Sequence, residues 1–104
     1  MTDVERISLE NPNTGESLRI RMLYYEHVRE AIMHAINEAG ELKFSELAGQ
    51  VEARTPRELW ADASVGWYAT SVKLDLEAKG LIAKEGSPQY IWLTPAGKAA
   101  LNAA

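Results

Sequence analysis

The sequence contains no cysteine in its 104 residues. This absence excludes disulfides, a thiolate nucleophile and any zinc or iron–sulfur site with cysteine ligands. Long apolar runs are also missing, because the longest charge-free stretches, 63–72 and 86–97, are too short and too polar for the ~20 residues of a membrane span. Residues 1–6 are charged and lack the apolar segment of a secretory signal. We therefore expect a soluble, cytoplasmic protein that does not contact membranes.

Basic residues are scarce, with 11 Lys and Arg against 15 Asp and Glu and a net charge of −4. Dedicated nucleic-acid binders are usually basic, because Lys and Arg residues that neutralise phosphates supply much of the affinity. The deficit lies mainly in residues 1–40, which hold seven acids and four bases, whereas residues 41–104 hold eight acids and seven bases. The charge balance argues against strong non-specific binding, but it leaves room for a local DNA contact in the second part.

The apolar residues, 46% of the chain, are enough for one domain with a core and follow clear local patterns. Alternation over 7–9 and 18–22, on either side of turn-forming residues 11–15, predicts a β-hairpin. Beyond this hairpin the spacing becomes that of amphipathic helices. The further expected elements are a helix over 24–39, an extended link at 42–44, helices over 45–51, 56–60 and 65–79, strands at 81–84 and 90–93, and a short helix after residue 94.

Capping residues mark the ends of these helices. A hydroxyl at the N-cap accepts a hydrogen bond from the first turn, and a glycine after the last turn adopts the positive φ that ends a helix. The pattern predicts both kinds of cap. The expected N-caps are Ser45, Thr55, Ser64 and Thr94, and the expected terminal glycines are Gly40 and Gly80.

Two segments carry a resemblance to a known superfamily. Residues 76–82 read LEAKGLI, similar to an LExxGLI exit from a recognition helix, and residues 90–97 read YIWLTPAG, similar to a Y-x-LTxxG return strand. With the order of the elements, they resemble the winged helix-turn-helix superfamily, in a MarR/PadR-like pattern, over about residues 24–97. Residues 66–68 and 72–77 also resemble a group of small uncharacterised bacterial proteins.

The resemblance implies an α+β fold, a winged helix-turn-helix with a three-helix core and a β-hairpin wing. This domain is expected over 23–104 with a short C-terminal helix, after an N-terminal β-hairpin extension at 1–22. Many winged-helix domains bind duplex DNA through the third helix and the wing, whereas others bind only proteins. The first functional expectation is therefore a DNA-binding, transcription-regulator-like protein.

The third helix offers few side chains suited to sequence-specific contacts with DNA. The wedge expected to face a groove holds one cation and one anion, Lys73 and Glu77, and no residue suited to bidentate base contacts. Two alternatives stay open: a Lys73 that extends past the core edge into water, and surface ion pairs of Arg54 and Arg57 with nearby acids. The candidate nucleic-acid contacts are Gly66, Thr70 and Lys73 on the third helix, Lys84, Ser87 and Gln89 in the wing, and Arg54 and Arg57 beside the second helix.

The opposite side of the third helix carries a second apolar stripe, formed by Trp67, Leu74 and Ala78. An apolar stripe is normally buried, and the N-terminal hairpin, the turn at 59–60 or the C-terminal helix would each bury it by packing against it. Otherwise it is an interface for a second copy or for another protein, because Trp is enriched at interfaces. The second functional expectation is therefore a winged-helix interaction or dimerisation module that binds no nucleic acid.

Metal binding and catalysis find little support in the sequence. The first helix places His27, Glu30, His34 and Glu38 at helical spacings, but the two histidines lie two turns, about 10 Å, apart, too far to share one ion easily. The sequence shows no nucleophile elbow and no Gly-rich phosphate loop. We expect no metal, no cofactor and no enzymatic activity.

Overall fold

The computed structural model describes residues 6–10 and 17–103 and has an α+β fold. The change in residue spacing that marks the sequence, from alternation to helical periodicity, coincides with the change from strand to helix at residue 22. In chain order the elements are β1 (Arg6–Glu10), β2 (Ser17–Arg21), α1 (Met22–Ala39), β3 (Glu41–Lys43), α2 (Phe44–Arg54), the short 3₁₀-helix η1 (Arg57–Trp60), α3 (Val65–Ala78), β4 (Ile82–Glu85), β5 (Tyr90–Leu93) and α4 (Pro95–Asn102).

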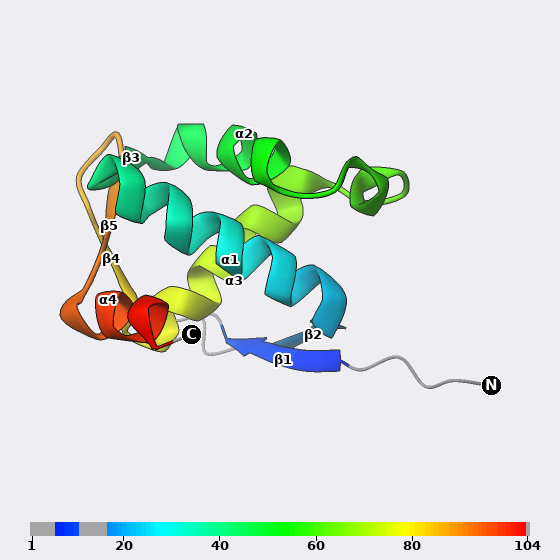
Figure 1. Cartoon of the computed structure of the whole chain (residues 1–104), viewed down its shortest axis with the longest axis horizontal. Coiled ribbons are helices and arrows are strands. Elements are labelled where there is room, and N and C mark those ends of the chain that lie inside the picture. Colours follow the sequence, from blue (N-terminus) through cyan, green and yellow to red (C-terminus); the bar gives the residue numbers. More distant parts are fainter. Residues whose placement is uncertain (1–5, 11–16, 104) are drawn as a thin grey trace.

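The helices α1 and α3 cross at the centre of the molecule, with α2 packed against both (Figure 1). An antiparallel sheet of order β3-β5-β4 lies at one end, with α4 beside it. Leu42 of β3 pairs with Ile91 of β5, and Ile82 of β4 pairs with Leu93, so the three strands turn apolar side chains toward the helices. None of the helices in the described ranges combines the length and the apolar character that a membrane span requires.

The core is built from the stripes that the helical spacing predicts. Val28, Ile32 and Ile36 of α1 are fully buried against Val72 and Leu76 of α3. One such stripe on each central helix holds the two together, since every buried apolar side chain contributes about 1.5 to 3 kcal/mol.

The N-terminal hairpin forms as predicted, with β1 antiparallel to β2 and Ile7 opposite Ile20. Leu9 is buried in the core, and β1 packs against α1 and α3. One detail differs from the prediction, because Met22 opens α1 instead of extending the strand. The predicted turn at 11–15 lies outside the described residues.

Two of the predicted N-caps are confirmed. The Ser64 hydroxyl accepts a hydrogen bond from the backbone N–H of Trp67 at 3.1 Å, at the start of α3. The Thr94 hydroxyl accepts one from the backbone N–H of Gly97 at 3.0 Å, at the start of α4. These bonds satisfy amide groups that have no partner within their helix.

The other two predicted N-caps are wrong. The helix α2 begins at Phe44, one residue before Ser45, and the Glu46 carboxylate accepts a hydrogen bond from the backbone N–H of Lys43 at 3.2 Å. Thr55 does not cap η1, because Pro56 stands at the N-cap and the Thr55 hydroxyl instead donates to a carbonyl of the last turn of α2 at 2.7 Å and accepts from the Trp60 indole. At both helix starts the hydrogen bonds that form differ from those of the predicted cap.

Candidate interaction surface

An ion network with a buried centre ties α3 to the hairpin formed by β4 and β5. The Lys73 ammonium lies 2.6 Å from a Glu77 carboxylate oxygen and donates a hydrogen bond of 2.6 Å to the Gln89 side-chain carbonyl. The second Glu77 oxygen lies 3.0 Å from the Lys84 ammonium. Lys73 also sits over the Phe44 ring, 4.9 Å from its centroid. We call these four polar side chains the Glu77 network.

The network corrects the expected DNA-facing wedge of the third helix. Lys73 is only 3% exposed and the Glu77 side chain 7%, whereas Gly66 is exposed and Thr70 half-buried. The expectation of a groove-facing Lys73, or of one extending into water, is therefore wrong. A buried ammonium requires a carboxylate and further hydrogen bonds to offset its desolvation, and the helical i, i+4 spacing of Lys73 and Glu77 supplies the first. That spacing is the signal in the sequence that indicates the pair.

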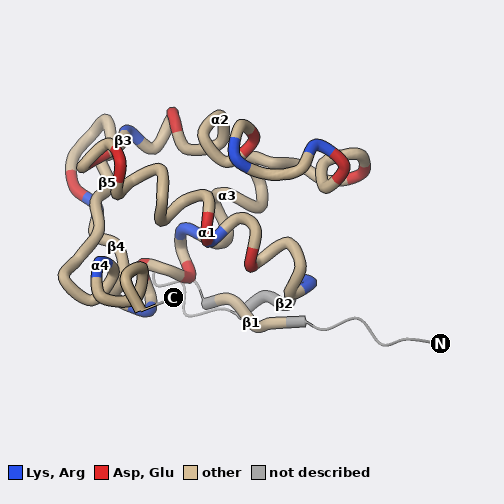
Figure 2. Tube along the Cα trace, viewed as in Figure 1, with Lys and Arg blue, Asp and Glu red and all other residues tan. Residues whose placement is uncertain are grey.

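The remaining candidate nucleic-acid residues do not gather on one surface. Lys84 and Gln89 belong to the Glu77 network, and Ser87 is exposed in the turn between β4 and β5. Arg54 forms a surface ion pair, as the alternative predicts, but its partner is Glu38 of α1 and not an acid close to it in the chain. Arg57 is exposed without a salt bridge among the described residues. Basic and acidic residues are interspersed along α2 and η1 (Figure 2).

Four aromatic rings meet where α1, η1 and α3 come together. Tyr24 of α1 stacks on Tyr68 of α3 with centroids 4.6 Å apart, and Trp60 of η1 lies 5.8 Å from both rings. Trp67 meets the edge of Tyr68 at 4.9 Å. We call these four side chains the aromatic cluster. The amino-acid sequence does not reveal this cluster, because its members come from three elements and only the fold places them in contact.

One side of the aromatic cluster is open to solvent. Trp67 and Leu23 are each 47% exposed and are the large apolar side chains that stand out most among the described residues. In the predicted second stripe of α3, Leu74 and Ala78 are half-buried. The hairpin strand β1 does pack on α3, but Trp67 remains exposed. The stripe is therefore covered only in part, and its tryptophan joins an exposed aromatic surface.

An open groove of about 730 Å³ lies between α2 and η1 and adjoins the aromatic cluster, because Trp60 lines both. The indole N–H of Trp60 donates to the Thr55 hydroxyl at 2.9 Å, which fixes the ring at this boundary. The groove is lined by Gly49, Glu52 and Ala53 of α2 and by Arg57, Glu58, Trp60 and Ala61 from η1 and its end.

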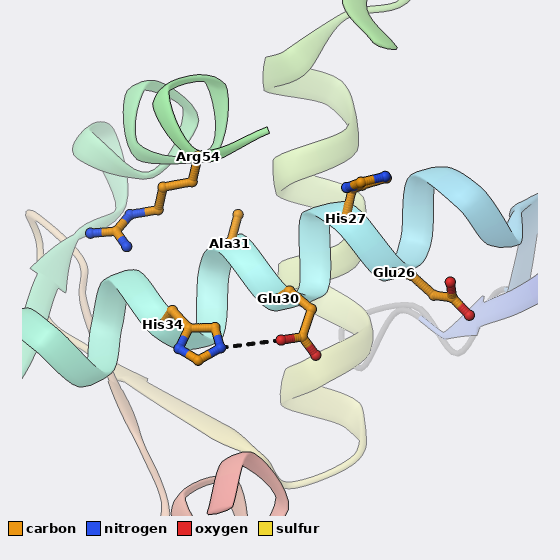
Figure 3. A pocket seen from close by; sticks show the side chains of 6 residues that line it. All are labelled: Glu26, His27, Glu30, Ala31, His34 and Arg54. Atoms are coloured by element: carbon orange, nitrogen blue, oxygen red, sulfur yellow. Dashed lines mark hydrogen bonds and ion pairs between the residues drawn. The ribbon is translucent and has the colours of Figure 1, made fainter. Parts of the chain in front are cut away.

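A second pocket, of about 400 Å³, lies over α1 (Figure 3). His34 lies 3.2 Å from Glu30, whereas His27 and Arg54 do not converge on that pair. Among the described residues no group of three or more His, Asp or Glu side chains is placed to hold a metal ion. The pocket is lined by Glu26, His27, Glu30, Ala31, His34 and Arg54.

A second buried charge joins α3 to α1. Asp75 is fully buried, and one of its carboxylate oxygens accepts hydrogen bonds from the Tyr25 hydroxyl at 3.1 Å and from the Lys79 ammonium at 2.7 Å. Lys79 also donates to the Tyr25 hydroxyl at 2.9 Å. Desolvation lowers the pKa of Lys79, but the hydrogen bonds to Asp75 and Tyr25 outweigh it, so the pKa lies above its ordinary value.

Comparison with known proteins gives a family but no activity. No curated protein and no solved structure is significantly similar to the chain. One family model, described as "Family of unknown function (DUF6958)", matches residues 6–91, which include the N-terminal hairpin, all three central helices and most of the sheet. The chain therefore belongs to this family of unknown function, DUF6958.

Proposed function

We propose that the protein is a winged-helix module that binds another protein through the aromatic cluster and the exposed part of α3. The order of the elements supports the winged-helix assignment, because helix, short strand, two helices and a hairpin follow one another from α1 to β5. The pairing of β3 with β5 beside the wing strand β4 is in keeping with it.

The proposal rests on which side chains of α3 are buried and which are exposed. The cation that would serve a DNA contact, Lys73, is buried, whereas the apolar Trp67 is 47% exposed on a cluster of four rings. Residues 63–72, which include the first half of α3, hold no charge at all. A partly exposed tryptophan backed by packed rings is a typical anchor for a protein interface and offers nothing to phosphates.

Duplex DNA, the other partner implied by the winged-helix resemblance, stays a prediction that one titration decides. A labelled random-sequence duplex is titrated with the protein at about 50 mM and about 200 mM salt, with fluorescence anisotropy as the readout. We expect no binding at either concentration. Binding at low salt that weakens steeply at the higher concentration would support the DNA-binding function instead.

The interface itself is tested by placing a photo-crosslinking amino acid at position 67 in the living source cell. The matched control carries the same amino acid at position 98, where Lys98 is exposed on α4. We expect one discrete heavier adduct from position 67 and none from position 98, because an interface anchor is in contact with its partner and a solvent-facing lysine is not. Equal adducts from both positions, or none from position 67, would refute the proposed function.

A further inference from the structure

Gly49 lies in the middle of α2 and lines the groove, although nothing in the fold requires a glycine there. A methyl group at this position would meet no heavy atom within 4 Å, and the backbone does not have a positive φ. Glycine inside a helix costs about 0.5 to 1 kcal/mol relative to alanine. The surface of α2 at Gly49 and, one turn later, at Ala53 therefore forms a depression, although a larger side chain would fit there.

The charges around the groove are free to meet a ligand. Glu52, Arg57 and Glu58 are exposed, and none of their side chains has a hydrogen-bonding or ion-pair partner within 6–10 and 17–103. Two carboxylates against one guanidinium give the groove a negative balance, in line with the net charge of −4 of the chain. The Trp60 ring on the same groove can attract a cation through its face.

We propose that this groove binds a basic amphipathic helix of a partner protein. The proposal rests on the proposed function and names the chemistry of its partner. Gly49 and Ala53 allow the backbone of a second helix to approach α2 closely, and lysine or arginine side chains on that helix pair with Glu52 and Glu58. Its apolar side continues past Trp60 onto the aromatic cluster.

Two synthetic peptides of about 18 residues, a length that forms about five helical turns, test the charge preference. Both have the same leucine and alanine face, and one carries lysine where the other carries glutamate. Calorimetric titration at about 50 mM salt is expected to detect binding of the lysine peptide alone, with weaker binding at about 200 mM salt because the contacts are screened. Failure of the lysine peptide to bind, or equal binding of the glutamate peptide, would overturn the proposal.

Two matched double variants test whether the lysine peptide binds in the groove. The double variant Glu52→Gln/Glu58→Gln is expected to bind the lysine peptide about fivefold more weakly than wild type. The control Glu41→Gln/Glu85→Gln removes two exposed carboxylates from the sheet and changes the net charge equally, and it is expected to leave the affinity unchanged. Equal losses in both double variants would show that only the overall charge matters and would refute the groove.

Gly49→Leu fills the groove without removing a charge. It is expected to abolish peptide binding while the temperature of thermal unfolding stays the same or rises, because leucine favours helix and its Cβ meets no atom within 4 Å. Retained binding would contradict the proposal. So would a wild-type dimer in light scattering that Gly49→Leu converts to a monomer, since the occupant would then be a second copy.

The two proposals fail separately. If the lysine peptide does not bind while the crosslinked adduct at position 67 persists, the groove inference is wrong and the interaction function stands. If the adduct at position 67 is absent, the interaction function is wrong whatever the peptides do.

Discussion

At the scale of single residues, Lys73 and Asp75 are the side chains that the fold treats most unexpectedly. They lie two positions apart on α3, so they point to opposite sides of the helix, and both are buried. Lys73 is compensated by Glu77 of α3 and by Gln89 beside β5, whereas Asp75 is compensated by Tyr25 and Lys79. A charge on each side of α3 therefore fixes how the helix is rotated between its neighbours.

Lys73→Ala is expected to lower the free energy of unfolding by about 3 to 5 kcal/mol, because it leaves the Glu77 carboxylate buried without its nearest cation. Urea unfolding measures the loss. Lys98→Ala, at an exposed position of α4, should change the free energy of unfolding by less than about 0.5 kcal/mol. The double variant Lys73→Met/Glu77→Leu should recover most of the stability, and a Lys73→Ala loss no larger than that of Lys98→Ala would contradict the network.

The raised pKa of Lys79 predicts that the free energy of unfolding depends on pH in the alkaline range. This pKa is higher in the folded protein than its ordinary value of 10.5, so folding favours the protonated ammonium. The stabilisation is fully present below the unfolded pKa and is lost as pH rises through the folded pKa. Urea unfolding should therefore show a stability difference between wild type and Lys79→Met that is constant up to about pH 10 and shrinks above it. A difference that stays constant into the alkaline range would contradict the raised pKa.

At the scale of elements, the sequence predicts most helices and strands because their spacing and their caps agree. Ser64 and Thr94 cap the helices that the apolar spacing predicts after them. The two wrong caps, Ser45 and Thr55, are hydroxyl residues close to a helix start with another hydrogen-bonding group nearby. Which group wins depends on backbone geometry that the sequence does not contain, so these boundaries move by a residue or two.

Gly97 in the short helix α4 allows a direct test of how closely two elements pack. A Cβ atom on Gly97 would lie 2.0 Å from the Leu81 carbonyl oxygen, so the helix packs directly against the backbone that leads into β4. Gly97→Ala is expected to lower the free energy of unfolding by about 1 to 3 kcal/mol, since the backbone must shift to make room. The matched change Gly49→Ala, at open space in α2, should raise it by about 0.5 to 1 kcal/mol. Urea unfolding of both variants checks the pair, and equal effects would contradict the difference in packing.

The candidate surface was far less predictable than the elements. The sequence indicates that Trp67 lies on a second apolar side of α3, and the structure places it in the exposed aromatic cluster. It does not indicate Tyr24, Trp60 and Tyr68, because their contacts join residues up to 44 positions apart in the chain. Nor does it indicate the groove, which exists only once η1 is placed beside α2.

At the scale of the whole molecule, the net charge does not show which charged side chains are exposed and unpaired. Of the two lysines expected to contact DNA, Lys73 is buried and Lys84 is paired with Glu77. Arg54 is paired with Glu38, which leaves Arg57 as the exposed arginine of the candidate set without a salt bridge in the part of the chain that the structure describes. The candidate cations among the described residues are therefore less available to phosphates than a residue count indicates.

The Glu77 network also gives the junction between α3 and the β4–β5 hairpin its own response to temperature. The cost of removing charged groups from water falls as temperature rises, because the entropy of their hydration is strongly negative. Apolar contacts, which hold the rest of the core, gain no comparable advantage per unit of buried area at high temperature. Relative to its apolar surroundings, the junction therefore gains strength at high temperature, where the hydrophobic contribution levels off.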